Sequence, residues 1–245
     1  MNLFQSLRGA VKRTRGVSEE EFKKWRREST DPVVRSGACY VPIPGKENIR
    51  LYQDKQNLHH LGRYEWASAI LRSQPKAETR VLDCACGVGY GSARLAEFAK
   101  SVDAVDSFRH AVLRAESRYP RSNLTFHHLD AFDIRSRFED ESFTTIVSFQ
   151  TIECLEDDGK FLDDAYALLK PGGQLLIDTP TRNRTVAKPA NKHQRRNYSV
   201  EEWLDLLLER FDRVNAFDTL PKIEVLRKYD FPSNGGIVQC TKSAP

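Results

Sequence analysis

The sequence predicts an α/β fold built on an open, mostly parallel β-sheet, and three observations predict it. Short apolar runs alternate with segments of helical periodicity along most of the chain. A glycine-rich turn follows the first apolar run, over residues 85–91. Polar residues stand where successive expected strands end, and in such a sheet these ends share one edge, where ligands bind.

The first expected element is a helix over residues 18–29, because Ser18-Glu19-Glu20-Glu21 is a capping box. Residues 33–50 have no regular period and contain two prolines. Residues 1–52 are therefore interpreted as an N-terminal helical arm, followed by one domain over residues 53–245. This domain should open with a helix over residues 54–73, which leads directly into the first strand and so should pack near the ligand site.

The later elements follow from periodicity and from turn residues. The expected helices cover residues 92–99, 109–119, 159–170 and 199–210, and the expected strands cover residues 101–106, 123–129, 143–149 and 174–178. The helix over 199–210 begins with a second capping box, Ser199-Val200-Glu201-Glu202. Pro171-Gly172-Gly173 is expected to separate the third of these helices from the strand that follows.

The glycine turn reads Asp83-x-x-x-Gly87-x-Gly89-x-Gly91, whereas a dinucleotide fingerprint spaces its glycines as Gly-x-Gly-x-x-Gly. A carboxylate beside the turn would repel a pyrophosphate, but it suits a ligand with an ammonium group and a sulfonium. About 20 residues beyond the turn, Asp106 ends the next strand, where an acid can bind ribose hydroxyls. Its alternative interpretation is the N-cap of the following helix.

These residues resemble the first motifs of the class I S-adenosylmethionine-dependent methyltransferases, and Leu169 to Gly173 resembles a later one. The resemblance implies a Rossmann-like sheet of seven strands with helices on both faces. It also implies that 214–219 and 236–241 form an antiparallel pair, with an antiparallel last strand. The implied cofactor is S-adenosylmethionine, with S-adenosylhomocysteine as the product. The cofactor-binding residues implied are Arg63, Tyr64, Asp83, Gly87, Gly89, Gly91, Asp106, Ser107, Asp130, Ala131, Phe132 and Gln150.

A looser likeness, to a bacterial subgroup linked to surface-glycan sugars and glycosylated natural products, is carried by four segments. They are His60-x-x-Arg63-Tyr64, Ala85 to Gly91, Ser148 to Glu153 and Asp178-Thr179-Pro180. This likeness implies methyl transfer to a hydroxyl of a sugar, a glycan or a small glycosylated metabolite. Cys154 stands where such enzymes usually have a histidine, which argues against base catalysis from that position.

The candidate general bases are therefore His193, Glu153, His59 and His60. His193 is preferred because it lies in the long basic segment 181–197, which is interpreted as an acceptor-side lid that favours an anionic acceptor. A solvated loop without a specific ligand is the alternative interpretation of this segment.

The composition of the chain bears on which binding partners are expected. The chain has 245 residues and a formal net charge of +4, which does not by itself indicate a nucleic-acid partner. No apolar run approaches the roughly 20 residues that a membrane span needs. Five scattered cysteines favour reduced thiols and a cytoplasmic location, and no cluster with metal-ligand spacing is visible. The sequence is also compatible with a homodimer.

Other functions compete with O-methylation. One is N-methylation of an amino sugar or another small amine, and another is methylation of RNA or protein through the basic segment. A non-catalytic protein that binds S-adenosylmethionine and interacts with a partner is a further alternative. A nicotinamide-dependent oxidoreductase is disfavoured by Asp83 and by the glycine spacing.

Overall fold

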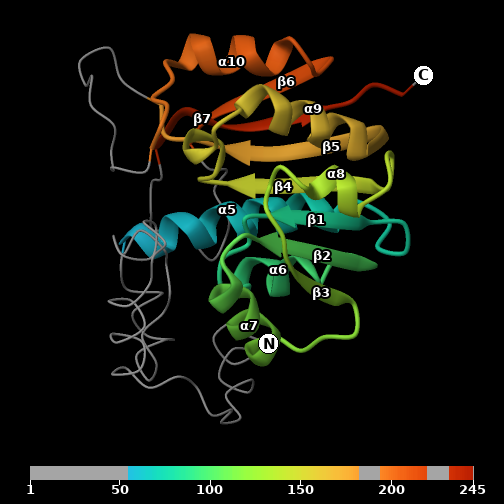
Figure 1. Cartoon of the computed structure of the whole chain (residues 1–245). Coiled ribbons are helices and arrows are strands. Elements are labelled where there is room, and N and C mark those ends of the chain that lie inside the picture. Colours follow the sequence, from blue (N-terminus) through green and yellow to red (C-terminus); the bar gives the residue numbers. More distant parts are fainter. Residues whose placement is uncertain (1–54, 182–193, 220–231, 245) are drawn as a thin grey trace.

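Seven strands form one sheet in the computed structural model, which describes residues 55–181, 194–219 and 232–244 (Figure 1). The strands are β1 (Arg80–Cys84), β2 (Ser101–Asp106), β3 (Leu124–His128), β4 (Phe143–Phe149), β5 (Leu169–Asp178), β6 (Arg213–Thr219) and β7 (Pro232–Thr241). Their order is β3-β2-β1-β4-β5-β7-β6, and β7 is antiparallel to both of its neighbours while β1 to β5 pair in parallel. The predicted fold class is confirmed, including the antiparallel final pair.

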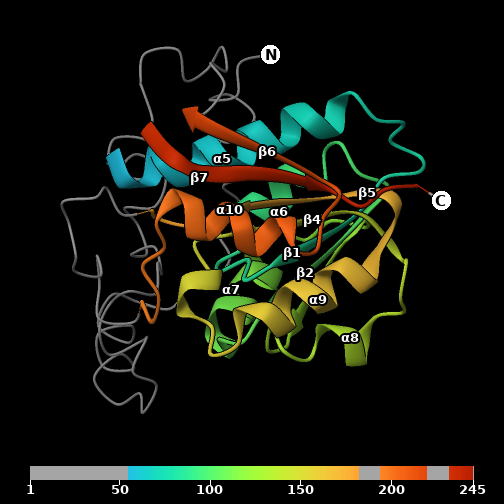
Figure 2. The same cartoon turned by 90° about the horizontal axis from the view of Figure 1, so that it is seen from above.

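Helices cover both faces of this sheet (Figure 2). The helices are α5 (Lys55–Arg72), α6 (Tyr90–Leu95) and α7 (Arg109–Arg118) on one face, and α8 (Ile134–Arg137), α9 (Asp158–Leu168) and α10 (Val200–Leu208) on the other. Neighbouring residues of β1 point to opposite faces, so Val81 joins the core with α5 and Leu82 joins the core with α9. Each fully buried aliphatic side chain of this kind contributes about 1.5–3 kcal/mol.

Several element boundaries differ from the sequence prediction; β7, for example, begins at Pro232 and not at residue 236, and two further differences have a visible cause. The helix after the glycine turn was expected over residues 92–99, but α6 ends at Leu95 because tighter turns follow, with Phe98 N–H bonded to the Leu95 carbonyl at 2.9 Å. Strand β5 begins at Leu169 and not at Gln174, because Leu169 pairs with Phe143 and a register shift carries the glycine-containing segment into the sheet.

Two short elements were not predicted, namely α8 and the 3₁₀ helix η1 (Ile152–Cys154). The capping box at Ser199 is confirmed, with reciprocal bonds between Ser199 and Glu202. The predicted helix over 18–29 and the arm over 1–52 lie outside the residues that the structure describes. Within the described ranges, no helix has the length and apolar character needed to cross a membrane.

Helix α5 packs beneath the glycine turn, as its position before β1 predicts, and it does so through a buried carboxylate. The Asp83 side chain has no exposed surface and accepts hydrogen bonds from Tyr64 Oη at 3.1 Å and from Ser92 Oγ at 2.6 Å. Burial raises the pKa of Asp83 to about 7, against the two hydroxyl donors, which lower it. Strand β1, helix α5 and helix α6 are thus joined at one side chain.

We expect Asp83→Asn to change how stability depends on pH. The folded protein keeps the Asp83 proton up to about pH 7, whereas the unfolded chain releases it near the ordinary pKa of 3.8. Between these two pH values Asp83 is ionised in the unfolded chain but still protonated in the folded protein. The free energy of unfolding therefore falls as the pH rises. Urea denaturation should show wild type losing roughly 2–4 kcal/mol relative to Asp83→Asn from about pH 4 to pH 7. Parallel pH curves for the two proteins would contradict this account.

Candidate active site at the carboxyl ends of the strands

The glycine turn after β1 combines two glycines that packing requires with one that faces open space. A Cβ atom at Gly89 would lie 2.6 Å from Ala115 Cβ, and one at Gly91 would lie 2.1 Å from the Tyr64 ring. At Gly87, which has a φ of 56°, no heavy atom lies within 4 Å of the Cβ position. A ligand can therefore approach the main chain at Gly87, while Gly89 lets α7 and Gly91 lets α5 pack closely against this segment.

Asp106, the last residue of β2, holds this turn in place. Its Oδ2 accepts a hydrogen bond from the Gly87 N–H at 2.8 Å, and its Oδ1 accepts one from the Phe108 N–H at 2.8 Å. Burial raises the pKa of Asp106, although the two backbone donors favour its ionised form. The N-cap of α7 is Phe108, so the alternative interpretation of Asp106 as that N-cap is wrong. The neighbouring Ser107 is exposed, and its carbonyl bonds the His128 ring at 3.0 Å.

A second turn follows β3 at the same end of the sheet. The exposed Asp130 accepts a hydrogen bond from the Phe132 N–H at 2.9 Å, which closes an Asx-type turn around Ala131. Ala131 and Phe132 pack against the core on the α9 face. Lys160 of α9 donates to the Phe132 carbonyl at 3.0 Å, so the turn is tied to the helix beside it.

A charged cluster lies at the ends of β4 and β5. Arg63 of α5 forms an ion pair with the buried Asp178, which ends β5. Asp178 also accepts hydrogen bonds from the backbone N–H of Gln150 at 2.9 Å and from its side-chain Nε2 at 2.7 Å. Gln150 directly follows β4 and has a left-handed φ of 55°, which is uncommon for a non-glycine residue.

Glu153 lies in η1, three residues beyond Gln150, and its side chain is 3% exposed. Its carboxylate accepts a hydrogen bond from Thr179 Oγ1 at 3.2 Å. Burial, followed by the charge of Asp178, raises the pKa of Glu153 to about 7. Burial also raises the pKa of the neighbouring Cys154 thiol to about 11, so Cys154 is neutral at pH 7 and does not replace a basic histidine.

The structure brings the predicted cofactor residues to one edge of the sheet, but at different depths. Tyr64, Asp83 and Gly91 lie beneath the turn and support it from within the core. The residues nearer the open side of this edge are Gly87, Asp106, Ser107, Asp130, Ala131, Phe132 and Gln150. His193 lies outside the described residues, and so do the side chains of His59 and His60.

Three residues that contact predicted site residues were not themselves predicted as site residues, namely Ser92, Asp178 and Thr179. The signal for Asp178 was present, because an acid at the end of an apolar strand is the same feature that identified Asp106. Ser92 and Thr179 give no such signal, since each is recognised only by the buried carboxylate that it contacts.

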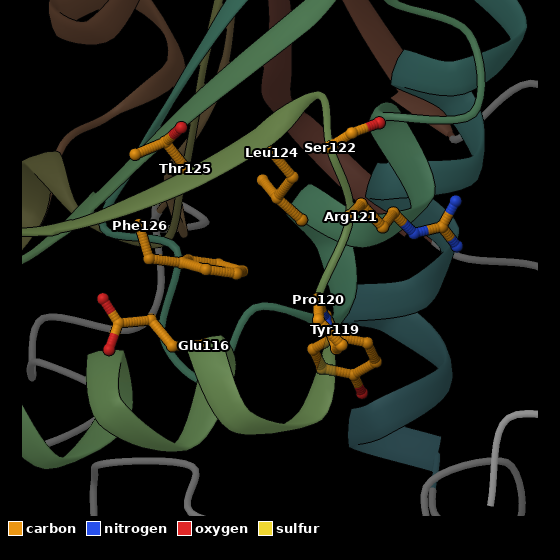
Figure 3. Close-up of a pocket in the computed structure, with 8 residues that line it drawn as sticks. All are labelled: Glu116, Tyr119, Pro120, Arg121, Ser122, Leu124, Thr125 and Phe126. Atoms are coloured by element: carbon orange, nitrogen blue, oxygen red, sulfur yellow. The ribbon is translucent and has the colours of Figure 1, made fainter.

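A hollow of about 500 Å³ lies elsewhere, beside the edge strand β3 and the end of α7 (Figure 3). Its walls include Tyr119, Leu124 and Phe126, and no predicted site residue lines it. In the part of the chain that the structure describes, no group of three or more His, Cys, Asp or Glu side chains could hold a metal ion. In the described residues, the buried acidic side chains and the glycine turn therefore remain the strongest candidates for a functional site, and they lie at the carboxyl ends of the strands.

The part of the chain that carries these strand ends is similar to known proteins. Residues 82–177, from β1 to β5, match a family described as "Methyltransferase domain". A protein of Mycolicibacterium smegmatis named a probable S-adenosylmethionine-dependent methyltransferase is 32% identical over 130 residues, which cover 52% of this chain and 49% of that one. The ubiquinone biosynthesis O-methyltransferase of Nitrobacter winogradskyi is 29% identical over 111 residues, covering 44% of this chain and 41% of that one.

This chain thus spans about half the length, or less, of the curated relatives compared above. Among solved structures, the YcgJ protein of Bacillus subtilis superposes with a TM-score of 0.56 at 15% identity, covering 74% of this chain and 100% of that one. That likeness supports the fold. The segment with the glycine turn and strands β1 to β5 is thus similar in sequence to methyltransferase domains, and the relatives compared are named as an S-adenosylmethionine-dependent methyltransferase and an O-methyltransferase.

Proposed function

We propose that this protein transfers a methyl group from S-adenosylmethionine to a hydroxyl of a sugar, a glycan or a small glycosylated metabolite. The observation that carries the cofactor part is the bond between Gly87 N–H and the Asp106 carboxylate, at 2.8 Å, beside the open space at Gly87. A nucleoside that approaches the turn there meets a carboxylate at the end of β2, which is suited to its ribose hydroxyls.

The residues at this edge fit the cofactor. A carboxylate offers about four acceptor positions, so Asp106 can accept from ribose hydroxyls in addition to its two backbone donors. Asp130, Ala131 and Phe132 form the turn that would face the adenine. The negative charge of Asp106 and Asp130 suits a ligand with a sulfonium better than it suits the pyrophosphate of a dinucleotide.

S-adenosylmethionine supplies a methyl group that is already activated for displacement. The residues of the chain then have to bind the acceptor, align its oxygen and remove its proton. Glu153 is the proposed proton acceptor, because it lies just beyond the end of β4 and its pKa is raised to about 7 by burial. A substantial ionised fraction is then present near neutral pH. His193 is kept as a second proposed base, with its position outside the described residues.

Two arguments support a hydroxyl acceptor, namely the presence of a possible base and the similarity to a named O-methyltransferase. A hydroxyl benefits from a base such as Glu153, and one relative is named an O-methyltransferase. The sugar part rests on the motif likeness to the glycan-linked subgroup. An anionic acceptor is supported by the basic segment, although its described arginines already have acidic partners, Arg195 with Glu156 and Arg196 with Asp158. The proposal includes a cytoplasmic location and assembly as a homodimer.

We expect calorimetric titration to show that S-adenosylmethionine and S-adenosylhomocysteine bind, and that nicotinamide dinucleotides do not. Asp106→Ala should weaken both by about tenfold or more, because hydrogen bonds to a charged group are lost. Asp103→Asn is the matched control, since Asp103 belongs to the same strand but pairs with Arg80 and His127. Equal affinities for Asp106→Ala and Asp103→Asn would refute the role of Asp106. A folded protein that binds none of these ligands would favour the interaction-protein alternative.

An acceptor screen tests the substrate class. Release of S-adenosylhomocysteine is measured with nucleotide sugars, aryl glycosides, amino sugars and a catechol, and turnover is expected with the hydroxyl-bearing sugars. Glu153→Gln should lower kcat for those acceptors by about 10²–10⁴-fold, the usual contribution of a general base. Turnover of amines alone, unaffected by Glu153→Gln, would instead establish N-methylation. Turnover of the catechol alone would reject the sugar assignment.

A further inference from the structure

Three segments that are distant in the sequence meet at Asp178, the last residue of β5. Arg63 reaches it from α5, and Gln150 reaches it from the turn after β4 with both its backbone and its side-chain nitrogen. The Gln150 N–H also lies 3.3 Å from the Asp178 carbonyl. Asp178 is 1% exposed. A carboxylate that is buried this deeply is stable in its charged form only with such partners, so the arrangement is specific.

Asp178 fixes a strained backbone. A left-handed conformation costs a non-glycine residue about 1–3 kcal/mol, and at Gln150 it is held by two bonds to one carboxylate. The chain continues from Gln150 directly into η1, where Cys154 N–H bonds the Thr151 carbonyl at 2.8 Å. This tight turn carries Glu153. The direction in which the chain leaves β4 therefore determines where the Glu153 carboxylate lies.

Asp178 also contributes to the charge around Glu153. The charge of Asp178 raises the pKa of Glu153, while the charge of Arg63 lowers it, in both cases less than burial does. Among the described residues, Cys154 and Tyr198 also lie near Glu153, and their pKa values are raised chiefly by burial, with a contribution from the Glu153 charge. Two arginines are close as well, since the backbone N–H groups of Arg195 and Arg196 bond the Glu153 carbonyl at 2.8 and 3.1 Å. Cys154 and Tyr198 are neutral at pH 7, and the side chains of Arg195 and Arg196 pair with Glu156 and Asp158. Among the described side chains, Asp178 and Arg63 are therefore the charges that shift the pKa of Glu153.

We propose that Asp178 is a positioning residue of the acceptor side, which holds Gln150 in its left-handed conformation and, together with Arg63, sets the charge that Glu153 experiences. The proposal rests on the proposed function in one respect, namely that Glu153 is the proton acceptor. Asp178 itself touches neither cofactor nor acceptor in this proposal. Its effect passes through Gln150 and Glu153.

The test follows the ionisation of Glu153 directly and needs no acceptor. The protein is labelled with ¹³C at its glutamate side-chain carboxyl groups, and the Glu153 signal is assigned by its absence from Glu153→Gln. Its titration is recorded for wild type, Asp178→Asn, Arg63→Gln and the control Asp103→Asn, each as free protein and with saturating S-adenosylhomocysteine. Hydrogen exchange of the Gln150 amide is measured in the same samples.

We expect the Glu153 midpoint to fall by about one pH unit in Asp178→Asn, because a nearby negative charge is removed. It should rise in Arg63→Gln, because a nearby positive charge is removed, and stay at the wild-type value in Asp103→Asn. The Gln150 amide should exchange at least about tenfold faster in Asp178→Asn, because its carboxylate acceptor is replaced by an amide.

A wild-type midpoint in Asp178→Asn overturns the proposal. If that variant does not fold, a wild-type midpoint in Arg63→Gln overturns it instead. The two proposals fail separately. Lack of S-adenosylhomocysteine binding by wild type would refute the proposed function, whereas the titration of the free protein still decides the role of Asp178.

Discussion

Acidic side chains gather where the parallel strands end, and the candidate site depends on how each carboxyl group there is held. Asp83 is enclosed by two hydroxyls, Asp106 accepts from backbone N–H groups, and Asp178 faces a guanidinium and an amide. These partners assign different roles. Hydroxyls can hold a buried carboxyl in either protonation state, backbone donors fix its position, and a guanidinium forms an ion pair with it.

Much of the fold could be predicted because local signals and tertiary pairing agree. Strands β2 and β4 have the bounds that their apolar runs predict, and the Ser199 capping box begins α10 where expected. The prediction failed where long-range pairing decides the structure. Leu169 becomes a strand residue because Phe143 lies beside it, and nothing in the local sequence of Leu169 indicates that partner.

The candidate site could also be predicted in part, namely its position but not the contacts of its buried residues. The topology alone places acids such as Asp106 at one edge of the sheet, because parallel strands share their carboxyl ends. The sequence could not indicate that Asp83 lies under the turn, since its burial depends on Tyr64 and Ser92 from other elements. It also could not indicate the contacts of Asp178, whose partners Arg63 and Gln150 are 115 and 28 positions away.

Helix α5 links the glycine turn after β1 to the charged cluster at the ends of β4 and β5, through two adjacent residues. Arg63 turns toward Asp178 on β5, while Tyr64 turns toward Asp83 on β1, so one helix contacts both sides of the point where the strand order reverses. A shift of α5 therefore alters the support of the glycine turn and the charge near Glu153 together. In the proposed function, cofactor binding and acceptor activation use separate residues that share this support, so a substitution within α5 should affect both.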